Sequence, residues 1–283
     1  MTLLSSTYGK GRVRVMRMAG EGDYREVREL EVRAMLTGDI GSAFTTADNS
    51  TTVSTDTIKN VINIVARENL QAGPELFCRA VAERFLDRYS GMASATVSAR
   101  ETRWERMTIE GVPHPHGFTR ESNGYGTSEV VSDRAGTSLS SGVSGFTFLK
   151  ATASGWADYV KDNYTTIPET HDRITATSME ANWRWTRDPA DFAAANARIL
   201  DTMLRVFATT YSHSVQDSLY RMGLAALDAV PELDTISLAC PNKHYLPINL
   251  APFGLDNPNR VFVATDEPHG QIECTVGRPQ AAR

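Results

Sequence analysis

The feature that most constrains the fold is a change of hydrophobic periodicity that occurs twice along the chain. Residues 12–18 and 30–36 place apolar side chains at every second position, as strands with one buried face do. Glycines before and after the second run predict a hairpin. From Ile58 to Val65 the apolar residues instead recur at the spacing of one helix face. A chain with this order must pack helices against a sheet.

The first half of the chain continues with a second helix and a return to strands. The helix is predicted from Pro74, a favoured first-turn residue, to about Tyr89. Either Thr55 or Asp56 is expected to cap the helix before it. Alternation then returns at 95–99, and the Gly-, Ser- and Thr-rich segment that follows predicts hairpins.

The second half repeats the same order of elements. Alternating runs at 143–152 and 175–185 precede two helical patterns, which begin near Pro189 and Ser214. Pro231 ends the second of these helices. Four short strands are then predicted, at 235–240, 244–250, 260–265 and 270–276.

Each half therefore has the order strand, strand, helix, helix, strand, strand. Antiparallel hairpins with helices grouped on one face make an α+β fold. We expect one unit at residues 1–138 and a second at residues 139–283. A four-stranded sheet leaves exposed edges, and closing several such sheets into a barrel would remove them. That reasoning predicts an oligomer.

Composition and charge narrow the function class. Apolar residues make up 41% and charged residues 22%, as in ordinary globular proteins. With 29 basic and 34 acidic residues the formal net charge is −5, so the basic excess of a nucleic-acid binder is missing. No apolar run has the ~18 residues of a membrane helix, and the N-terminus does not read as a signal peptide.

Cysteine usage and the chain terminus bear on location. Cys78, Cys240 and Cys274 are odd in number, far apart and outside any CxxC motif, which indicates thiols in a reducing compartment. The last residues, 280–283, do not form a peroxisomal address of the Ser-Lys-Leu type. We therefore expect a cytoplasmic location.

Five short stretches combine polar, cationic and aromatic residues in a way that scaffold alone does not require. They are Tyr8–Lys10, Ser54–Asn60, Tyr164–Ile174, Ser214–Gln216 and Pro241–His244. In this order and spacing they resemble the motifs of urate oxidases, and the resemblance runs from Tyr8 to about Arg278.

The resemblance implies a fold, a reaction and an assembly. The fold would be the tunnelling fold, with two ββααββ units per chain. Urate would be oxidised by O₂ and water to 5-hydroxyisourate and hydrogen peroxide, without cofactor or metal, because the substrate itself supplies the electrons. The assembly would be a homotetramer with active sites at subunit interfaces.

Substrate contacts follow from the same resemblance. Arg173 and Gln216 would clamp the pyrimidine edge of urate, since a guanidinium fork and a planar amide suit an anionic, imide-like edge. Val215 belongs to the same motif as Gln216. Trp156 and Ile167 would pack the two faces of the ring. The family usually has Phe at the position of Trp156, so the pocket is roomier here or the alignment is shifted.

Catalytic roles are implied for residues of both halves. Lys10 and Thr55 resemble the proton-relay pair of the family, and a basic lysine requires a lowered pKa. Asp56 would bind the anion through its main-chain amide at a helix start. Asn242 would face the oxygen or peroxide site. His244 would share a strand face with Asn242 and support the relay.

Each of these residues, taken alone, has an ordinary alternative. Arg173 would pair with Glu169 or Asp172, Trp156 would be a core aromatic, and the remaining polar residues would be solvated or structural. His114 and His116 alternate as metal ligands can, so a metal enzyme is a rival hypothesis. A purine-binding tetramer without catalysis is another.

Overall fold

The computed structural model describes residues 1–279 as two compact units, Met1–Gly142 and a second unit that begins at Val143. Residues 280–283, on which the expectation about a peroxisomal address rests, lie outside the described residues. No helix within the described part of the chain is long and apolar enough to cross a membrane.

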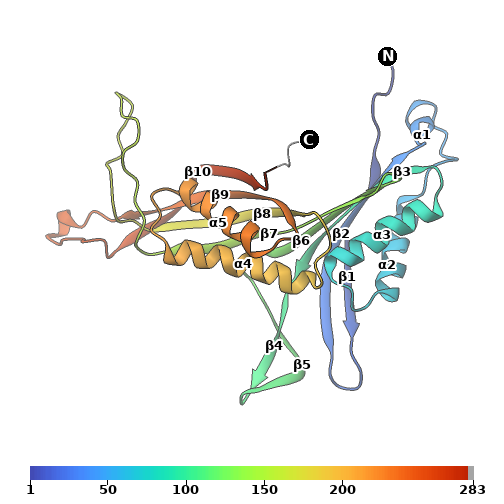
Figure 1. The fold of residues 1–283 in the computed structure, drawn as a ribbon, viewed down its shortest axis with the longest axis horizontal. Helices are drawn as coiled ribbons and strands as arrows, with labels where there is room; N and C mark the ends of the chain where they lie inside the picture. The colour runs from blue at the N-terminus through green and yellow to red at the C-terminus, as the bar shows by residue number, and fades with distance from the viewer. Residues whose placement is uncertain (280–283) are drawn as a thin grey trace. The chain divides into compact units, whose positions relative to one another are not determined.

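The first unit is a four-stranded antiparallel sheet in the order β1-β2-β3-β6, with helices on one face (Figure 1). A separate hairpin of β4 and β5 extends from it. The elements are β1 (Tyr8–Ala19), β2 (Glu26–Gly38), α1 (Gly41–Thr45), α2 (Thr55–Glu68), α3 (Pro74–Arg88), β3 (Met92–Thr102), β4 (Trp104–Ile109), β5 (Val112–Arg120) and β6 (Tyr125–Asp133).

The second unit has strands in the order β7-β8-β9-β10, with α4 and α5 packed over them (Figure 1). Its elements are β7 (Thr137–Lys150), which begins in the first unit, β8 (Thr175–Trp185), α4 (Phe192–Thr209), α5 (Val215–Ala229), β9 (Leu233–Pro247), the short 3₁₀ helix η1 (Ala251–Phe253) and β10 (Phe262–Gly277). The predicted α+β arrangement of strands and helices is confirmed.

The core explains why these segments adopt these elements. Every second residue from Leu30 to Leu36 in β2 is buried, with Val32, Ala34 and Leu36 at 0% exposure. The apolar face of α2, which includes Ile58 and Ile62, is buried as well. Strand and helix periodicities therefore converge on one apolar layer, whose burial is the main driving force for folding.

Two local predictions are wrong. Ser54, and neither Thr55 nor Asp56, caps α2, because its hydroxyl accepts from the Thr57 amide at 3.0 Å. The four short C-terminal strands are two long ones, β9 and β10. Pro241, which has no amide proton, and a register shift between Thr265 and Gly270 interrupt the alternation, so each long strand looks like two short ones.

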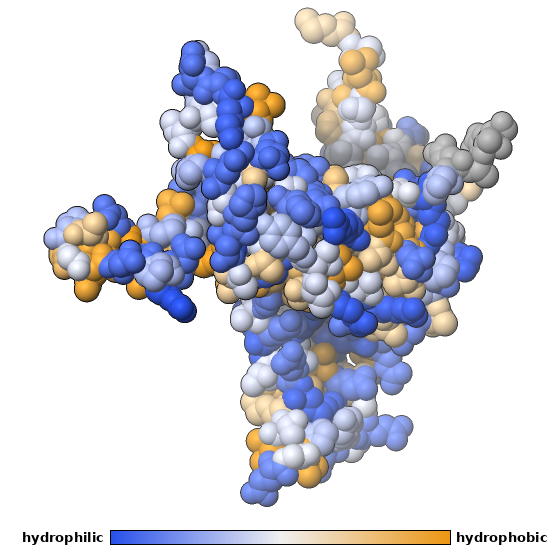
Figure 2. All heavy atoms as spheres, turned by 60° about the vertical axis from the view of Figure 1, so that its left-hand side comes forward, coloured by the Kyte–Doolittle hydropathy of each residue, from blue (hydrophilic) through white to orange (hydrophobic). Residues whose placement is uncertain are grey.

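A segment between β9 and β10 leaves several large apolar side chains uncovered. Phe253 is 76% exposed and Leu255 is 60% exposed, and the neighbouring Ile248, Val261 and Val263 are exposed too. Figure 2 shows apolar residues gathered on the arm at its left. Such a cluster on a folded unit marks an interaction surface.

Removing Trp183 tests the core of the second unit. Its ring is 1% exposed, and its Nε1 donates to Asn196 Oδ1 of α4 at 2.9 Å. We expect Trp183→Ala to lower the free energy of unfolding by about 3–5 kcal/mol, because it leaves a cavity and removes the hydrogen bond to Asn196. Arg184→Ala is the control, since this side chain is 62% exposed and its ion pair with Asp234 is long at 3.7 Å. Denaturant unfolding followed by circular dichroism measures both, and equal losses would contradict the assignment.

Thiol labelling tests the burial of the cysteines. Burial raises the pKa of Cys78 and of Cys240 to about 12. Because the thiolate is the reactive form, roughly one molecule in ten thousand is reactive at these positions at pH 8. We expect a disulfide reagent at pH 8 to label only Cys274 within minutes, and all three thiols in guanidinium chloride. Rapid labelling of three thiols in the native protein would contradict this burial.

Candidate active site

The first unit brings Lys10 next to the N-terminus of α2. Lys10 pairs with Ala34 immediately before a register shift in β1. The Val53 amide donates to the Tyr8 hydroxyl at 2.8 Å and so holds the segment before α2 against β1. The positive charge of Lys10 also contributes to lowering the pKa of Asp56. Two of the predicted catalytic motifs therefore meet within this unit.

The start of α2 presents main-chain amides beside the Asp56 carboxylate, which two neighbouring side chains bind. The first-turn amides of Thr55 and Asp56 have no acceptor within the helix. The Asp56 carboxylate is bound by the Lys59 ammonium group and by Asn60 Nδ2 at 3.1 Å. Its pKa is lowered, mainly by the hydrogen bond from Lys59. The exposed helix start is therefore suited to bind an anion through its N–H groups.

In the second unit, the loop of residues 151–174 between β7 and β8 carries three of the candidates; we call it the strap (Figure 1). Trp156 and Thr170 form an antiparallel bridge, with their N···O distances at 2.7 and 2.9 Å. Ser154 forms a parallel bridge with Ser212, and the Arg173 amide donates to the Ser154 carbonyl at 2.9 Å. The two ends of the strap are thereby held beside the segment that leads into α5.

Arg173 carries a buried hydrogen-bond donor that has no partner within residues 1–279. Its guanidinium carbon lies 5.9 Å from the centre of the Trp156 ring, and its buried Nε has no hydrogen-bond partner among the described residues. Burial lowers its pKa, and the nearby Tyr211 opposes that shift. A buried donor without a partner is costly, and an anionic ligand over Trp156 would satisfy it.

The alternative salt bridges for Arg173 have other partners. Lys161 Nζ donates to Glu169 Oε1 at 2.7 Å, and Thr152 Oγ1 donates to Asp172 Oδ1 at 2.6 Å. Both carboxylates stabilise the strap itself. The guanidinium group is left directed toward Trp156.

The start of α5 is fixed by a chain of hydroxyl bonds. The Ser214 hydroxyl accepts from the Asp217 amide at 3.0 Å, so the helix begins at Val215 with Gln216 in its first turn. Ser218 Oγ donates to Ser212 Oγ at 2.8 Å, and Lys150 Nζ donates to the same oxygen at 2.8 Å. Val215 is buried and Gln216 is exposed, so the amide of Gln216 is available to a ligand.

Strand β9 supplies the last two candidates. Asn242 is 8% exposed and lies opposite Thr177 in β8 and Gly270 in β10. His244 follows two residues later and so shares the same face. Its carbonyl accepts from Thr265 Oγ1 at 3.1 Å. The ten candidates thus form two groups, three residues in the first unit and seven in the second.

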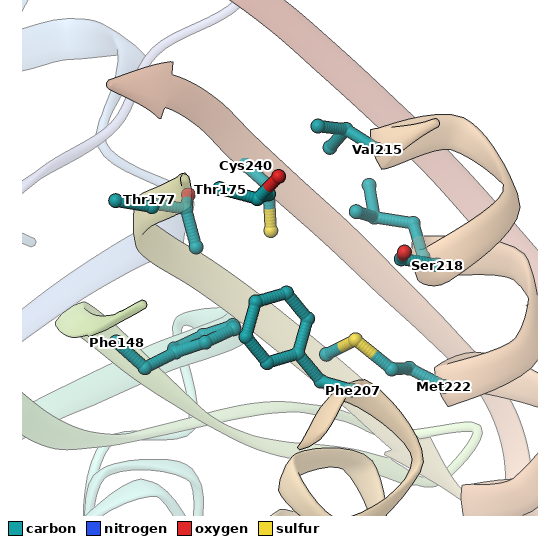
Figure 3. A pocket seen from close by; sticks show the side chains of 10 residues that line it. Phe148, Thr175, Thr177, Phe207, Val215, Ser218, Met222 and Cys240 are labelled. Carbon is teal, nitrogen blue, oxygen red and sulfur yellow. The ribbon is translucent and has the colours of Figure 1, made fainter. Parts of the chain in front are cut away.

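A small cavity lies behind Val215, and it is not the substrate site. It has about 10 Å³ of free space, which is at most room for one water molecule. Figure 3 shows Phe148 and Phe207 side by side at its edge, with the sulfur atoms of Met222 and Cys240 nearby. The two phenylalanine rings meet edge to face, with centroids 4.8 Å apart. A purine cannot fit in this cavity. The residues that line it form an apolar wall behind the start of α5.

Sequence reasoning missed the residues that support the strap. A Cβ atom on Gly155 would lie 2.4 Å from the Tyr211 hydroxyl oxygen and 2.9 Å from the Thr170 carbonyl oxygen, so a larger residue here would displace the strap backbone. That hydroxyl donates to the His171 carbonyl at 2.8 Å. Ser154, buried at 0% exposure, donates to the Arg173 carbonyl. Two small residues, Ser154 and Gly155, precede Trp156 and are a local sign of close packing. Nothing in their spacing links them to Tyr211.

The histidine pair behind the metal hypothesis lies on the β4–β5 hairpin. The rings of His114 and His116 meet edge to face, with centroids 4.6 Å apart. Within residues 1–279, no three or more His, Cys, Asp or Glu side chains are grouped as metal ligands would be.

Comparison with known proteins gives a single family. The family model described as Uricase matches residues 6–130 and 139–273. The uricase of Aspergillus flavus is 37% identical over 290 residues, which cover 97% of this chain and 96% of that protein. The uricase of Arthrobacter globiformis is 34% identical over 278 residues, covering 98% of this chain and 90% of that protein.

Solved structures agree with the sequence matches. The crystal structure of the Arthrobacter globiformis uricase superposes with a TM-score of 0.94 at 34% identity, covering 100% of this chain and 97% of that one. A uricase from Bacillus fastidious gives a TM-score of 0.84 at 25% identity, covering 96% of this chain and 94% of that one. The family model, the related sequences and the superposed structures agree, and the chain belongs to the uricase family.

Proposed function

We propose that this protein is a urate oxidase, which converts urate, O₂ and water into 5-hydroxyisourate and hydrogen peroxide. Family membership supports the reaction class. The observation that carries the assignment on the molecule itself is the buried, unpartnered Nε of Arg173 beside the ring of Trp156. A cationic donor next to an aromatic face suits a flat anion.

Substrate binding would use both edges and faces of the purine. Arg173 would donate to the anionic pyrimidine side, and Gln216 would pair with the adjoining imide edge through its planar amide. Trp156 would stack on one face, with more ring area than the phenylalanine usual at this position. Ile167 would cover the other face, and Val215 would pack beside Gln216.

Chemistry would proceed by proton and electron transfer from urate itself. Bound urate monoanion would lose a further proton to the relay formed by Lys10 and Thr55, with His244 supporting it. The dianion would pass electrons to O₂, giving a ring hydroperoxide. Asn242 would stabilise the developing peroxide anion by donating a hydrogen bond. Elimination of hydrogen peroxide and addition of water complete the balance.

A homotetramer with sites at subunit interfaces completes the proposal. Lys10, Thr55 and Asp56 belong to the first unit, whereas the other residues proposed to contact the purine belong to the second. By resemblance to the family, Thr55 and Asp56 reach the ligand bound by a neighbouring subunit. The uncovered apolar side chains between β9 and β10 support an assembly that buries them (Figure 2).

The direct test follows urate absorbance and dissolved oxygen together, using purified protein treated with chelator. We expect one O₂ consumed and one hydrogen peroxide released for each urate lost. Loss of urate only after a metal is restored would establish the metal-enzyme alternative. If urate binds without oxygen uptake, the protein is a purine binder and the proposed reaction is wrong.

Substitution of Lys10 tests the relay. We expect Lys10→Ala to lower kcat by about 10²- to 10⁴-fold, the usual contribution of a positioned acid or base. The KM for urate should change much less, because Lys10 lies in the first unit and not among the purine contacts. Arg67→Ala removes an exposed cation from the last turn of α2 and is the matched control. A kcat within twofold of wild type for Lys10→Ala would rule out the relay.

A further inference from the structure

One side chain of the strap contacts both proposed walls of the purine slot. The ring of Tyr159 stacks on the indole of Trp156, with centroids 5.3 Å apart and an angle of 14° between the planes. The hydroxyl of the same residue donates to the Ile167 carbonyl at 2.6 Å. Trp156 and Ile167 are eleven positions apart in sequence, and Tyr159 joins them.

We propose that Tyr159 is a positioning residue that fixes Trp156 relative to Ile167 and thereby sets the affinity for the flat substrate. The inference rests on the proposed function, because it concerns how that site holds urate. Tyr159 itself need not touch the ligand. It stacks on one face of the indole, and the purine would stack on the other.

The exposure of Ile167 makes the hydroxyl bond important. Its side chain is 55% exposed, so core packing does not hold it in place. The bond to its carbonyl and the bridge between Trp156 and Thr170 hold residues 156–159 of the strap against residues 167–170. Without the hydroxyl, the bonds that join these two segments would be those of Glu169 and Thr170, which lie two and three residues after Ile167.

Tyr159 is itself held by its neighbours. Asp158 has a left-handed backbone with φ of 58°, and its amide donates to Glu169 Oε1 at 3.0 Å. Lys161 donates to the same oxygen at 2.7 Å, and its ammonium group lies 5.7 Å from the centre of the Tyr159 ring. One carboxylate thus binds the residues on both sides of Tyr159, which stops the ring from swinging away.

The size of the stacked pair explains why such a device is needed. An indole has a larger surface than the phenylalanine usual in the family, and a misplaced indole would obstruct the slot. Offset stacking at centroid distances of about 4.5–7 Å is the preferred geometry of aromatic pairs. Tyr159 provides that stack, and its hydroxyl sets the distance to the second wall.

The experiment separates the hydroxyl from the ring. Tyr159→Phe keeps the stack on Trp156 and removes only the bond to Ile167, whereas Tyr159→Leu removes both. We expect the KM for urate to rise about 3- to 10-fold in Tyr159→Phe, the range for loss of one hydrogen bond, with kcat within about twofold. Tyr159→Leu should raise KM further. Tyr220→Phe, which removes a hydroxyl from a 55% exposed ring on α5, is the matched control.

A second readout follows the strap without substrate. Hydrogen exchange at the amides of Trp156 and Thr170 should quicken in Tyr159→Phe and stay unchanged in Tyr220→Phe. Wild-type KM in Tyr159→Phe, or a lower kcat and Tm with unchanged KM, overturns the positioning role and leaves urate oxidation standing. Wild-type protein that consumes no urate overturns the proposed function instead, so the two failures are distinct.

Discussion

The candidate site depends on a short backbone pairing between the strap and the segment before α5. Ser154 bridges Ser212, the Gly155 amide donates to the Ser212 carbonyl at 2.9 Å, and the Ser212 amide donates to the Ala153 carbonyl at 3.0 Å. These bonds bring the ends of two segments to one place. Arg173 then sits beside Trp156, and the first turn of α5 begins nearby. Without this pairing, the bond from the Tyr211 hydroxyl to the His171 carbonyl would still join the strap to the segment before α5.

Burial at this junction holds polar side chains in position as well as contributing to stability. Lys150, which caps the end of α4 through the carbonyls of Phe207 and Thr210, has its pKa lowered by burial. Arg173 is half-buried, and its Nε lacks a partner. Buried donors without a partner cost stability. They are retained where a ligand completes them, which is the usual balance between stability and function at a site.

Each unit contributes different residues to the proposed site. The first unit contributes a lysine on a strand next to a helix start, where Asp56 forms an ion pair with Lys59. The second contributes the aromatic face, the cation and the amide of Asn242. The same element order builds both units, and the candidates lie on strands β1 and β9, at the starts of α2 and α5, and on the strap. The sheets therefore carry part of the proposed site, and the strap and the helix starts that they support carry the rest.

Periodicity along the sequence determined the helices, most of the strands and the α+β class, because burial of one face imposes a spacing that can be read directly. The ordered motifs determined the family. Tertiary structure alone decided that Ser54 caps α2, that β9 and β10 are long strands, and that Glu169 and Asp172 bind Lys161 and Thr152 and leave Arg173 unpaired. The cap is a choice among three neighbouring residues that can all serve, whereas the strand pairing and the partners of Glu169 and Asp172 depend on residues farther away in sequence. In each case, spacing along the chain does not encode which of several acceptable partners a side chain will meet.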